Sequence, residues 1–188
     1  RYLIGLIIFL PYLVKLYYSS FNRSNLSNYY VRAMFHSLGV VCWFYSMSKL
    51  PVAEVTAIGY LTPVLIALGA VIFFGEKISY WRIGAIVLAF GGVLIILRPG
   101  FQELSMGHAA QLCATIFFAG SYLLVKKLTH TESAMAIVAM MTFLVTLMLA
   151  PMAVIVWVPP TVNEIILLFF TAIFATAGHF FMTKAFSL

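Results

Sequence analysis

The sequence contains no aspartate, and its five acidic residues are all glutamates. Charged residues of either sign make up only 9% of the chain, whereas 64% of its 188 residues are hydrophobic. This balance lies far outside that of a soluble globular domain, whose surface needs many more charged side chains. The scarcity of charge therefore argues against a water-soluble fold and indicates a chain that lies mostly in a lipid bilayer.

Signals of catalytic chemistry are scarce as well. The two cysteines, Cys42 and Cys113, lie in apolar stretches and lack the spacing of a metal site or a disulfide framework. No glycine-rich phosphate loop and no set of nucleophile, base and orienting group can be assembled from the sequence. We therefore expect no cofactor, no metal site and no enzyme activity. An intramembrane enzyme is the alternative from a different class, and a receptor or assembly subunit is a third.

What the sequence does contain is long apolar segments separated by short charged stretches. A helix that crosses a bilayer core of about 30 Å needs roughly 20 such residues. The segments that meet this length predict seven transmembrane helices, at residues 2–18, 31–49, 52–74, 80–97, 107–127, 133–157 and 165–186. The expected fold is an all-α polytopic membrane protein.

The net charge of +6 is spread singly between these segments, which argues against a nucleic-acid partner. Threading the chain back and forth places eight basic residues on one side, namely Lys15, Arg23, Arg32, Lys77, Arg82, Lys126, Lys127 and Lys184. Only Arg1, Lys49 and Arg98 lie on the other side. Because cytoplasmic loops are enriched in Lys and Arg, we predict that the 19–30, 75–79 and 128–132 loops are cytoplasmic.

A weak internal repeat relates the two parts of the chain. Residues 43–50 can be aligned with residues 181–188, and five predicted helices separate the equivalent segments. An odd number of helices inverts the second copy in the membrane. We predict inverted five-helix repeats with seven of ten helices present. Residues 1–97 would form the first repeat without its first helix, and 107–188 the second without its last two. We expect the 188 residues alone not to transport.

Four short motifs follow one another in a characteristic order, namely Leu50-Pro51-Val52-Ala53-Glu54, Tyr60-Leu61-Thr62-Pro63, Gly75-Glu76-Lys77 and Gly91-Gly92-Val93. This order resembles the drug/metabolite transporter superfamily of EamA type. The resemblance implies ten helices, cytoplasmic termini and a central cavity for a small-molecule metabolite. It also implies a multi-pass protein of the bacterial inner (plasma) membrane. The sequence leaves both a monomer and a homodimer open.

A closer resemblance concerns residues 35–39, 53–60 and 175–179, which look like the alphaproteobacterial riboflavin-uptake branch. This resemblance implies riboflavin as the substrate. The alternative within the same superfamily is an exporter of a metabolite or drug.

Polar side chains recur every three or four residues along the 107–127 segment, as His108, Gln111, Thr115, Phe118 and Tyr122, and so share one helix face. A cavity wall and a set of hydrogen bonds between helices explain this face equally well. Two weaker stripes of the same kind each contain a histidine. The 165–186 segment has Ala172, Thr176, His179 and Thr183, and the 31–49 segment has His36, Val40, Trp43 and Met47. For both histidines we favour packing over function.

The 52–74 segment combines an acid with a helix breaker. Glu54 lies in the first turn after Pro51, where the helix dipole stabilises a carboxylate, and it is also a candidate for charge recognition or proton linkage. Pro63 cannot donate a hydrogen bond to the carbonyl of Gly59, so we predict a kink beside Tyr60. Gly84, Gly91 and Gly92 on the next segment favour close helix packing.

These features together predict a secondary transporter that moves a small organic metabolite by alternating access. The expected substrate-binding residues are Trp43, Glu54, Tyr60, Gln111, Thr115, Tyr122 and His179.

Overall fold

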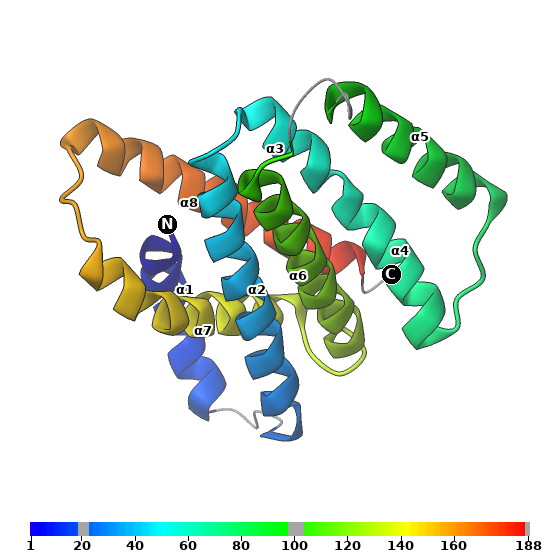
Figure 1. Cartoon of the computed structure of the whole chain (residues 1–188). Coiled ribbons are helices and arrows are strands. Elements are labelled where there is room, and N and C mark those ends of the chain that lie inside the picture. Colours follow the sequence, from blue (N-terminus) through cyan, green and yellow to red (C-terminus); the bar gives the residue numbers. More distant parts are fainter. Residues whose placement is uncertain (19–22, 98–103, 187–188) are drawn as a thin grey trace. The chain divides into compact units, whose positions relative to one another are not determined.

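The computed structural model describes residues 1–18, 23–97 and 104–186, and these ranges fold into helices without strands (Figure 1). The helices are α1 (Tyr2–Tyr18), α2 (Leu26–Met47), α3 (Val52–Gly59), α4 (Leu61–Phe74), α5 (Tyr80–Leu97), α6 (Met106–Leu128), α7 (Ala134–Ile155) and α8 (Val162–Ala185). A short 3-10 helix, Arg23–Asn25, precedes α2. Arg98, and the last two residues of the predicted repeat, lie outside the described residues.

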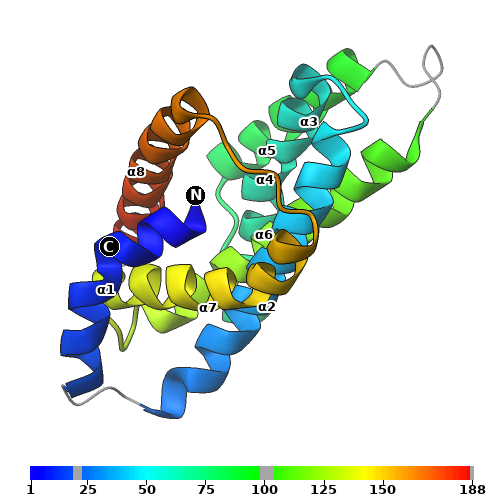
Figure 2. The same ribbon diagram turned by 90° about the vertical axis from the view of Figure 1, so that its left-hand side faces the viewer.

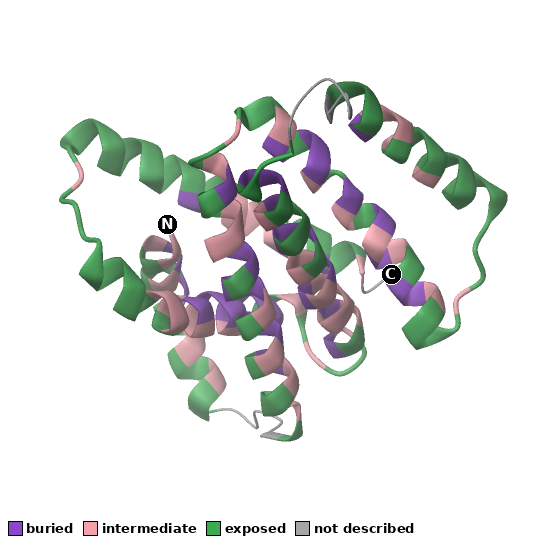
Figure 3. Cartoon of the chain, in the orientation of Figure 1, coloured by how far each residue is buried: buried purple, intermediate pink, exposed green. Residues whose placement is uncertain are grey.

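The predicted spans match these helices, and α3 and α4 together form the 52–74 span. Within the described part of the chain, four stretches are long and apolar enough to cross a membrane, namely Val52–Phe74, Met106–Leu128, Ala134–Ile155 and Val162–Ala185. Outward-facing side chains are themselves apolar, as on α8, where Phe174 is 72% exposed (Figure 3). Such a surface suits lipid rather than water. The chain is therefore a polytopic helical membrane protein, as predicted.

The described residues divide into two compact units, and the first contains residues 1–34 and 124–188. In this unit α1 packs against α7 and α8 (Figure 2). Phe9 of α1 is buried against Val138 and Ala139 of α7. Apolar side chains on three helices thus form the core of the first unit.

α2 begins at Leu26, five residues before the predicted start of its span, because its polar first turn is held by the 128–132 turn. Asn25 donates a hydrogen bond to the Glu132 carboxylate at 2.8 Å, and Lys127 donates to Asn28 at 3.3 Å. Burial, and then the nearby Glu132, raise the pKa of the Tyr29 hydroxyl, which therefore stays protonated. The contacts place two predicted cytoplasmic segments at the same end of this unit, in agreement with the threading.

The second unit contains residues 35–123 and therefore α3, α4, α5 and most of α2 and α6. α2 and α6 pack reciprocally, with a glycine on each helix facing a phenylalanine on the other. A Cβ on Gly39 would lie 2.8 Å from the Phe118 ring, and a Cβ on Gly120 would lie 2.9 Å from the Phe35 ring. Only glycine lets the two helices approach this closely.

The glycines of α5 behave differently from our prediction. A Cβ added to Gly84, Gly91 or Gly92 would meet no atom within 4 Å. The expectation that they favour close packing is therefore wrong for this unit, because open space rather than a helix backbone lies beside them.

Candidate functional site

The helix of the 52–74 span is broken in two at Tyr60, as the positions of Gly59 and Pro63 predict. α3 ends at Gly59 and α4 begins at Leu61, while Tyr60 keeps right-handed backbone angles. Pro63 lacks an N–H, so the carbonyl of Gly59 has no donor four residues ahead. A polar backbone group is thereby released in the middle of a membrane-spanning segment.

The polar face of α6 points into the second unit, as predicted, while its other face is exposed. His108, Gln111 and Thr115 are 7%, 2% and 1% exposed, whereas Ile116 is 57% exposed. Both α3 and α6 begin at the same end of the unit, since Gly107 packs against the side chains of Lys49 and Leu50. The polar face of α6 therefore runs beside the first turns of α3.

Glu54 and His108 join α3 to α6. The Oε2 atom of Glu54 lies 3.1 Å from Nε2 of His108, and the two side chains are only 15% and 9% exposed. The other ring nitrogen, Nδ1, lies 3.0 Å from both the backbone nitrogen and the hydroxyl of Ser105. The imidazole is thus held on both sides.

These partners determine which nitrogen of His108 carries the hydrogen. The backbone N–H of Ser105 can only donate, so Nδ1 must accept and be unprotonated. The hydrogen is therefore on Nε2, which donates to the Glu54 carboxylate. The imidazole of His108 is therefore neutral in the described state.

Gln111 follows His108 by one turn and lies beside the helix break. Its Nε2 atom is 3.5 Å from the position that a Cβ of Gly59 would occupy. Its Oε1 atom is buried and has no hydrogen-bond partner among the described residues. A buried acceptor without a donor costs about 1–3 kcal/mol, so this amide is a candidate for binding a solute or water.

Thr115 adds a weaker link between α6 and α3. Its hydroxyl lies 2.8 Å from the carbonyl of Gln111 and 3.5 Å from that of Ile58. The structure thus brings Glu54, Gln111 and Thr115 together along one seam between α3 and α6.

Tyr60 lines a separate groove between the broken helix and α5, with a volume of about 540 Å³. The side chain is 66% exposed, and the other lining residues are mostly apolar, with Pro63 among them and Arg82 the charged exception. This volume falls in the range of small-molecule sites, about 300–1,000 Å³.

The remaining predicted residues of the second unit lie elsewhere on α2 and α6. Trp43 is half-buried on α2, with its ring centroid 5.1 Å from that of Phe44. Tyr122 is half-buried two turns beyond Thr115 on α6. His36 is buried, and its ring packs at 5.2 Å against Phe118, which agrees with a packing role.

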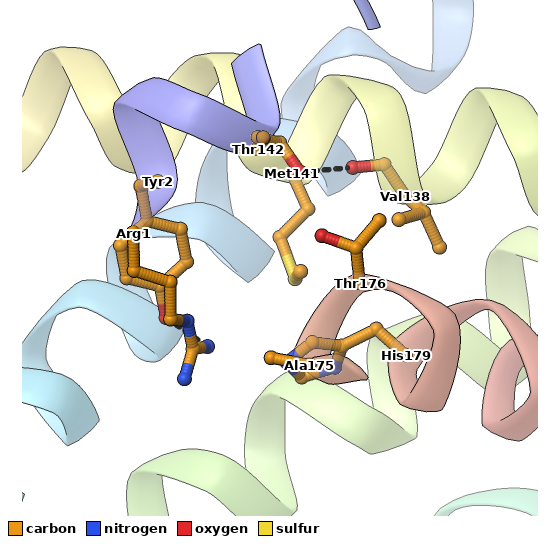
Figure 4. A pocket seen from close by; sticks show the side chains of 9 residues that line it. Arg1, Tyr2, Val138, Met141, Thr142, Ala175, Thr176 and His179 are labelled. Atoms are coloured by element: carbon orange, nitrogen blue, oxygen red, sulfur yellow. Dashed lines mark hydrogen bonds between the residues drawn. The ribbon is translucent and has the colours of Figure 1, made fainter. Parts of the chain in front are cut away.

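His179 belongs to the first unit, where it lines a small cavity of about 10 Å³ with Arg1, Thr142 and Thr176 (Figure 4). That volume holds about one water molecule. The Thr142 hydroxyl donates to the carbonyl of Val138 on its own helix. The inward face of α8 is confirmed by Ala172 and Thr183, which are 0% and 2% exposed.

The Glu54–His108 pair is the feature that reasoning from the sequence missed, although both residues stood out separately. Its signal is the spacing of Ser105 and His108. Ser105 directly precedes α6, so the side chain three positions later can accept a hydrogen bond from its N–H in the first turn of the helix. That geometry fixes Nδ1 and leaves Nε2 to point at a neighbouring helix.

The sequence profile of the EamA-like transporter family matches residues 1–98, slightly more than half of the chain. The chain belongs to this family. The family resemblance that the motifs predicted is therefore confirmed. No solved structure matches the chain significantly.

Three relatives illustrate what this family member is similar to. A pseudopaline exporter of Pseudomonas aeruginosa is 28% identical over 165 residues, covering 84% of this chain and 56% of the relative. An S-adenosylmethionine uptake transporter of Rickettsia bellii is 26% identical over the whole chain and 65% of its own length. A riboflavin transporter of Brucella anthropi is 26% identical, again over the whole chain and 68% of its own length. The chain thus spans between 56% and 68% of these relatives.

Proposed function

We propose that this EamA-family protein is part of a secondary transporter that moves a small organic metabolite across the membrane by alternating access. The observation that carries the proposal is the broken helix at Tyr60 beside the inward polar face of α6. Helices interrupted within a membrane place free carbonyls and polar side chains at transporter binding sites. Here the break adjoins an unsatisfied amide, Gln111, and a carboxylate, Glu54, lies in the first turn of the same broken helix.

The names of the relatives support the class of solute. Pseudopaline, S-adenosylmethionine and riboflavin are all small organic metabolites, although one relative is an exporter and two act in uptake. We place this protein in the inner membrane of a bacterium, because these relatives are bacterial. The opposite direction, export of a metabolite or drug, is the second candidate, and the exporter of Pseudomonas aeruginosa is the observation that favours it.

Riboflavin is the first solute to test. The groove beside Tyr60 has apolar walls that suit a flat ring, and Arg82 and the Tyr60 hydroxyl offer polar groups for the edge of such a ring. Trp43, Tyr122 and His179 remain proposed members of the binding site.

The experiment measures uptake and efflux of labelled riboflavin by cells that express the full-length protein carrying this sequence. We expect saturable flux that falls at least about tenfold in Glu54→Gln and Tyr60→Ala, equivalent to a loss of about 1.4 kcal/mol of solute stabilisation. Glu76→Gln and Tyr80→Ala serve as matched controls, because Glu76 pairs with Arg82 at a helix end and Tyr80 is 92% exposed.

The outcomes distinguish a wrong choice of solute from a wrong proposal of transport. Flux of another metabolite in a panel, without flux of riboflavin, would remove riboflavin and keep the transporter. An absence of flux for every solute tested, in a protein that reaches the membrane, would contradict the transporter itself.

A further inference from the structure

In the described state the Glu54–His108 pair shares one hydrogen, which is bonded to Nε2 of His108. The pair can accept one more proton, on Nδ1 or on the carboxylate. A proton on Nδ1 would turn this nitrogen into a donor that faces the N–H donor of Ser105. A proton on the Glu54 carboxylate would instead weaken the charge-assisted bond between α3 and α6. Protonation of Nδ1 thus breaks the bond from the Ser105 N–H within the first turn of α6 but strengthens the attraction to Glu54, whereas protonation of Glu54 loosens the contact between α3 and α6.

The surroundings of the pair make it suitable for binding a proton reversibly. Both side chains are largely buried, yet Glu54 retains 15% exposure, which leaves a route for protons. Among the described residues, the titratable side chain in contact with His108 is Glu54 from α3. The positive end of α3 favours the ionised form of the Glu54 carboxylate.

The next turn of α6 contains the side-chain amide of Gln111, which could form a new hydrogen bond if α6 moved away from α3. The Oε1 atom of Gln111 is buried without a partner, while its Nε2 end lies beside Gly59. When protonation of Glu54 lets the first turn of α6 move away from α3, a solute or water can reach this amide and satisfy it. Proton binding at the pair and solute binding at the amide are then linked through one helix.

We propose that the Glu54–His108 pair is a proton-binding site that couples proton movement to solute movement, an inference that rests on the proposed transport function. One proton binds to the pair and is released again, and no covalent bond other than that to the proton forms or breaks. Protonation of Nδ1 breaks the hydrogen bond from the Ser105 N–H, because Nδ1 can then no longer accept it.

The decisive variant is His108→Gln. A glutamine can accept from Ser105 through Oε1 and donate to Glu54 through Nε2, so it imitates the neutral tautomer but cannot itself take up a proton, which leaves Glu54 as the only proton acceptor of the pair. His130→Gln is the matched control, because His130 is an exposed histidine in the turn after α6.

The first measurement uses the proton itself as the probe. The full-length protein is labelled with ¹⁵N-histidine, ¹⁵N-serine and ¹³C-glutamate and titrated by NMR, and the histidine signals lost in His108→Gln identify His108. We expect hydrogen on Nε2 alone at high pH and a second proton on the pair as the pH falls, with the Ser105 amide shifting in parallel. A hydrogen on Nδ1 at high pH, or a ring and carboxylate that bind no proton between about pH 8 and 5, would overturn the proposal.

The second measurement follows labelled riboflavin, or a panel solute that the flux assay has identified, in proteoliposomes. We expect a pH gradient to drive accumulation in the wild type and in His130→Gln, whereas His108→Gln loses this accumulation and retains solute exchange. Accumulation in His108→Gln equal to that of the wild type would refute the coupling site and leave the transporter intact. Loss of exchange in all proteins would instead contradict the proposed function.

Discussion

At the scale of single residues, buried polar groups in this protein differ in how well they are satisfied. The guanidinium of Arg32 is 1% exposed, and it donates to the carbonyl of Ile137 at 2.7 Å and contacts the sulfur of Met141 at 3.2 Å. The amide oxygen of Gln111 is almost as buried but has no donor in the described chain. Arg32 is therefore a structural link between α2 and α7, whereas Gln111 is a candidate for binding.

Arg32→Lys tests this structural role. A lysine keeps the charge but cannot reach the carbonyl and the sulfur with two separate donors. We expect a loss of about 1.5–3 kcal/mol in the free energy of unfolding, the usual contribution of a hydrogen bond to a charged group. Thermal unfolding in detergent measures it.

Arg82→Lys is the matched control for that experiment. Arg82 pairs with Glu76 at 3.0 Å, but its side chain is 51% exposed, so the same replacement should cost less than about 1 kcal/mol. Equal losses at both positions would contradict the role of Arg32.

At the scale of helices, the break between α3 and α4 costs a backbone hydrogen bond and leaves the carbonyl of Gly59 without its helical donor. Pro63→Ala restores the N–H that the carbonyl of Gly59 lacks. We expect a higher melting temperature and slower solute exchange, because a continuous helix hides the carbonyl. Pro151→Ala is the control, since Pro151 lies inside α7 without dividing it. Unchanged exchange in Pro63→Ala would show that the break does not serve transport.

The reciprocal packing of α2 and α6 gives a second prediction for helices. In Gly120→Ala the new Cβ lies 2.9 Å from the Phe35 ring, and such overpacking costs about 1–3 kcal/mol. Gly84→Ala meets no neighbour, and the better helix propensity of alanine should stabilise it by up to about 1 kcal/mol. Opposite shifts of the melting temperature are expected, and shifts of the same sign would contradict the packing.

At the scale of the whole molecule, the direction of the helices determines which turns share a side of the membrane. The turn at 128–132 is predicted to be cytoplasmic, and the turn at Lys49 is predicted to lie on the opposite side. In a background with Cys42 and Cys113 replaced, we expect Lys49→Cys to react with a membrane-impermeant thiol reagent in intact cells. His130→Cys should react only after the cells are permeabilised. The reverse pattern would invert the topology.

The sequence by itself determined the helices, since a stretch of about 20 apolar residues in a membrane has no alternative that satisfies its backbone. It also located the kink at Tyr60, because proline removes a hydrogen bond wherever it stands, and it identified the inward face of α6 from the helical period. The predicted repeats rest on sequence equivalence rather than on packing, and they remain a prediction.

Only the tertiary structure decided which polar residues meet. Glu54 and His108 are 54 positions apart, and the imidazole reaches the carboxylate because Ser105 fixes the ring and α6 runs beside α3. Tyr60 faced a groove rather than the seam, and the glycines of α5 lay beside open space instead of a helix. Periodicity gives the face of one helix, whereas a contact depends on the rotation and distance of two helices, which packing alone sets.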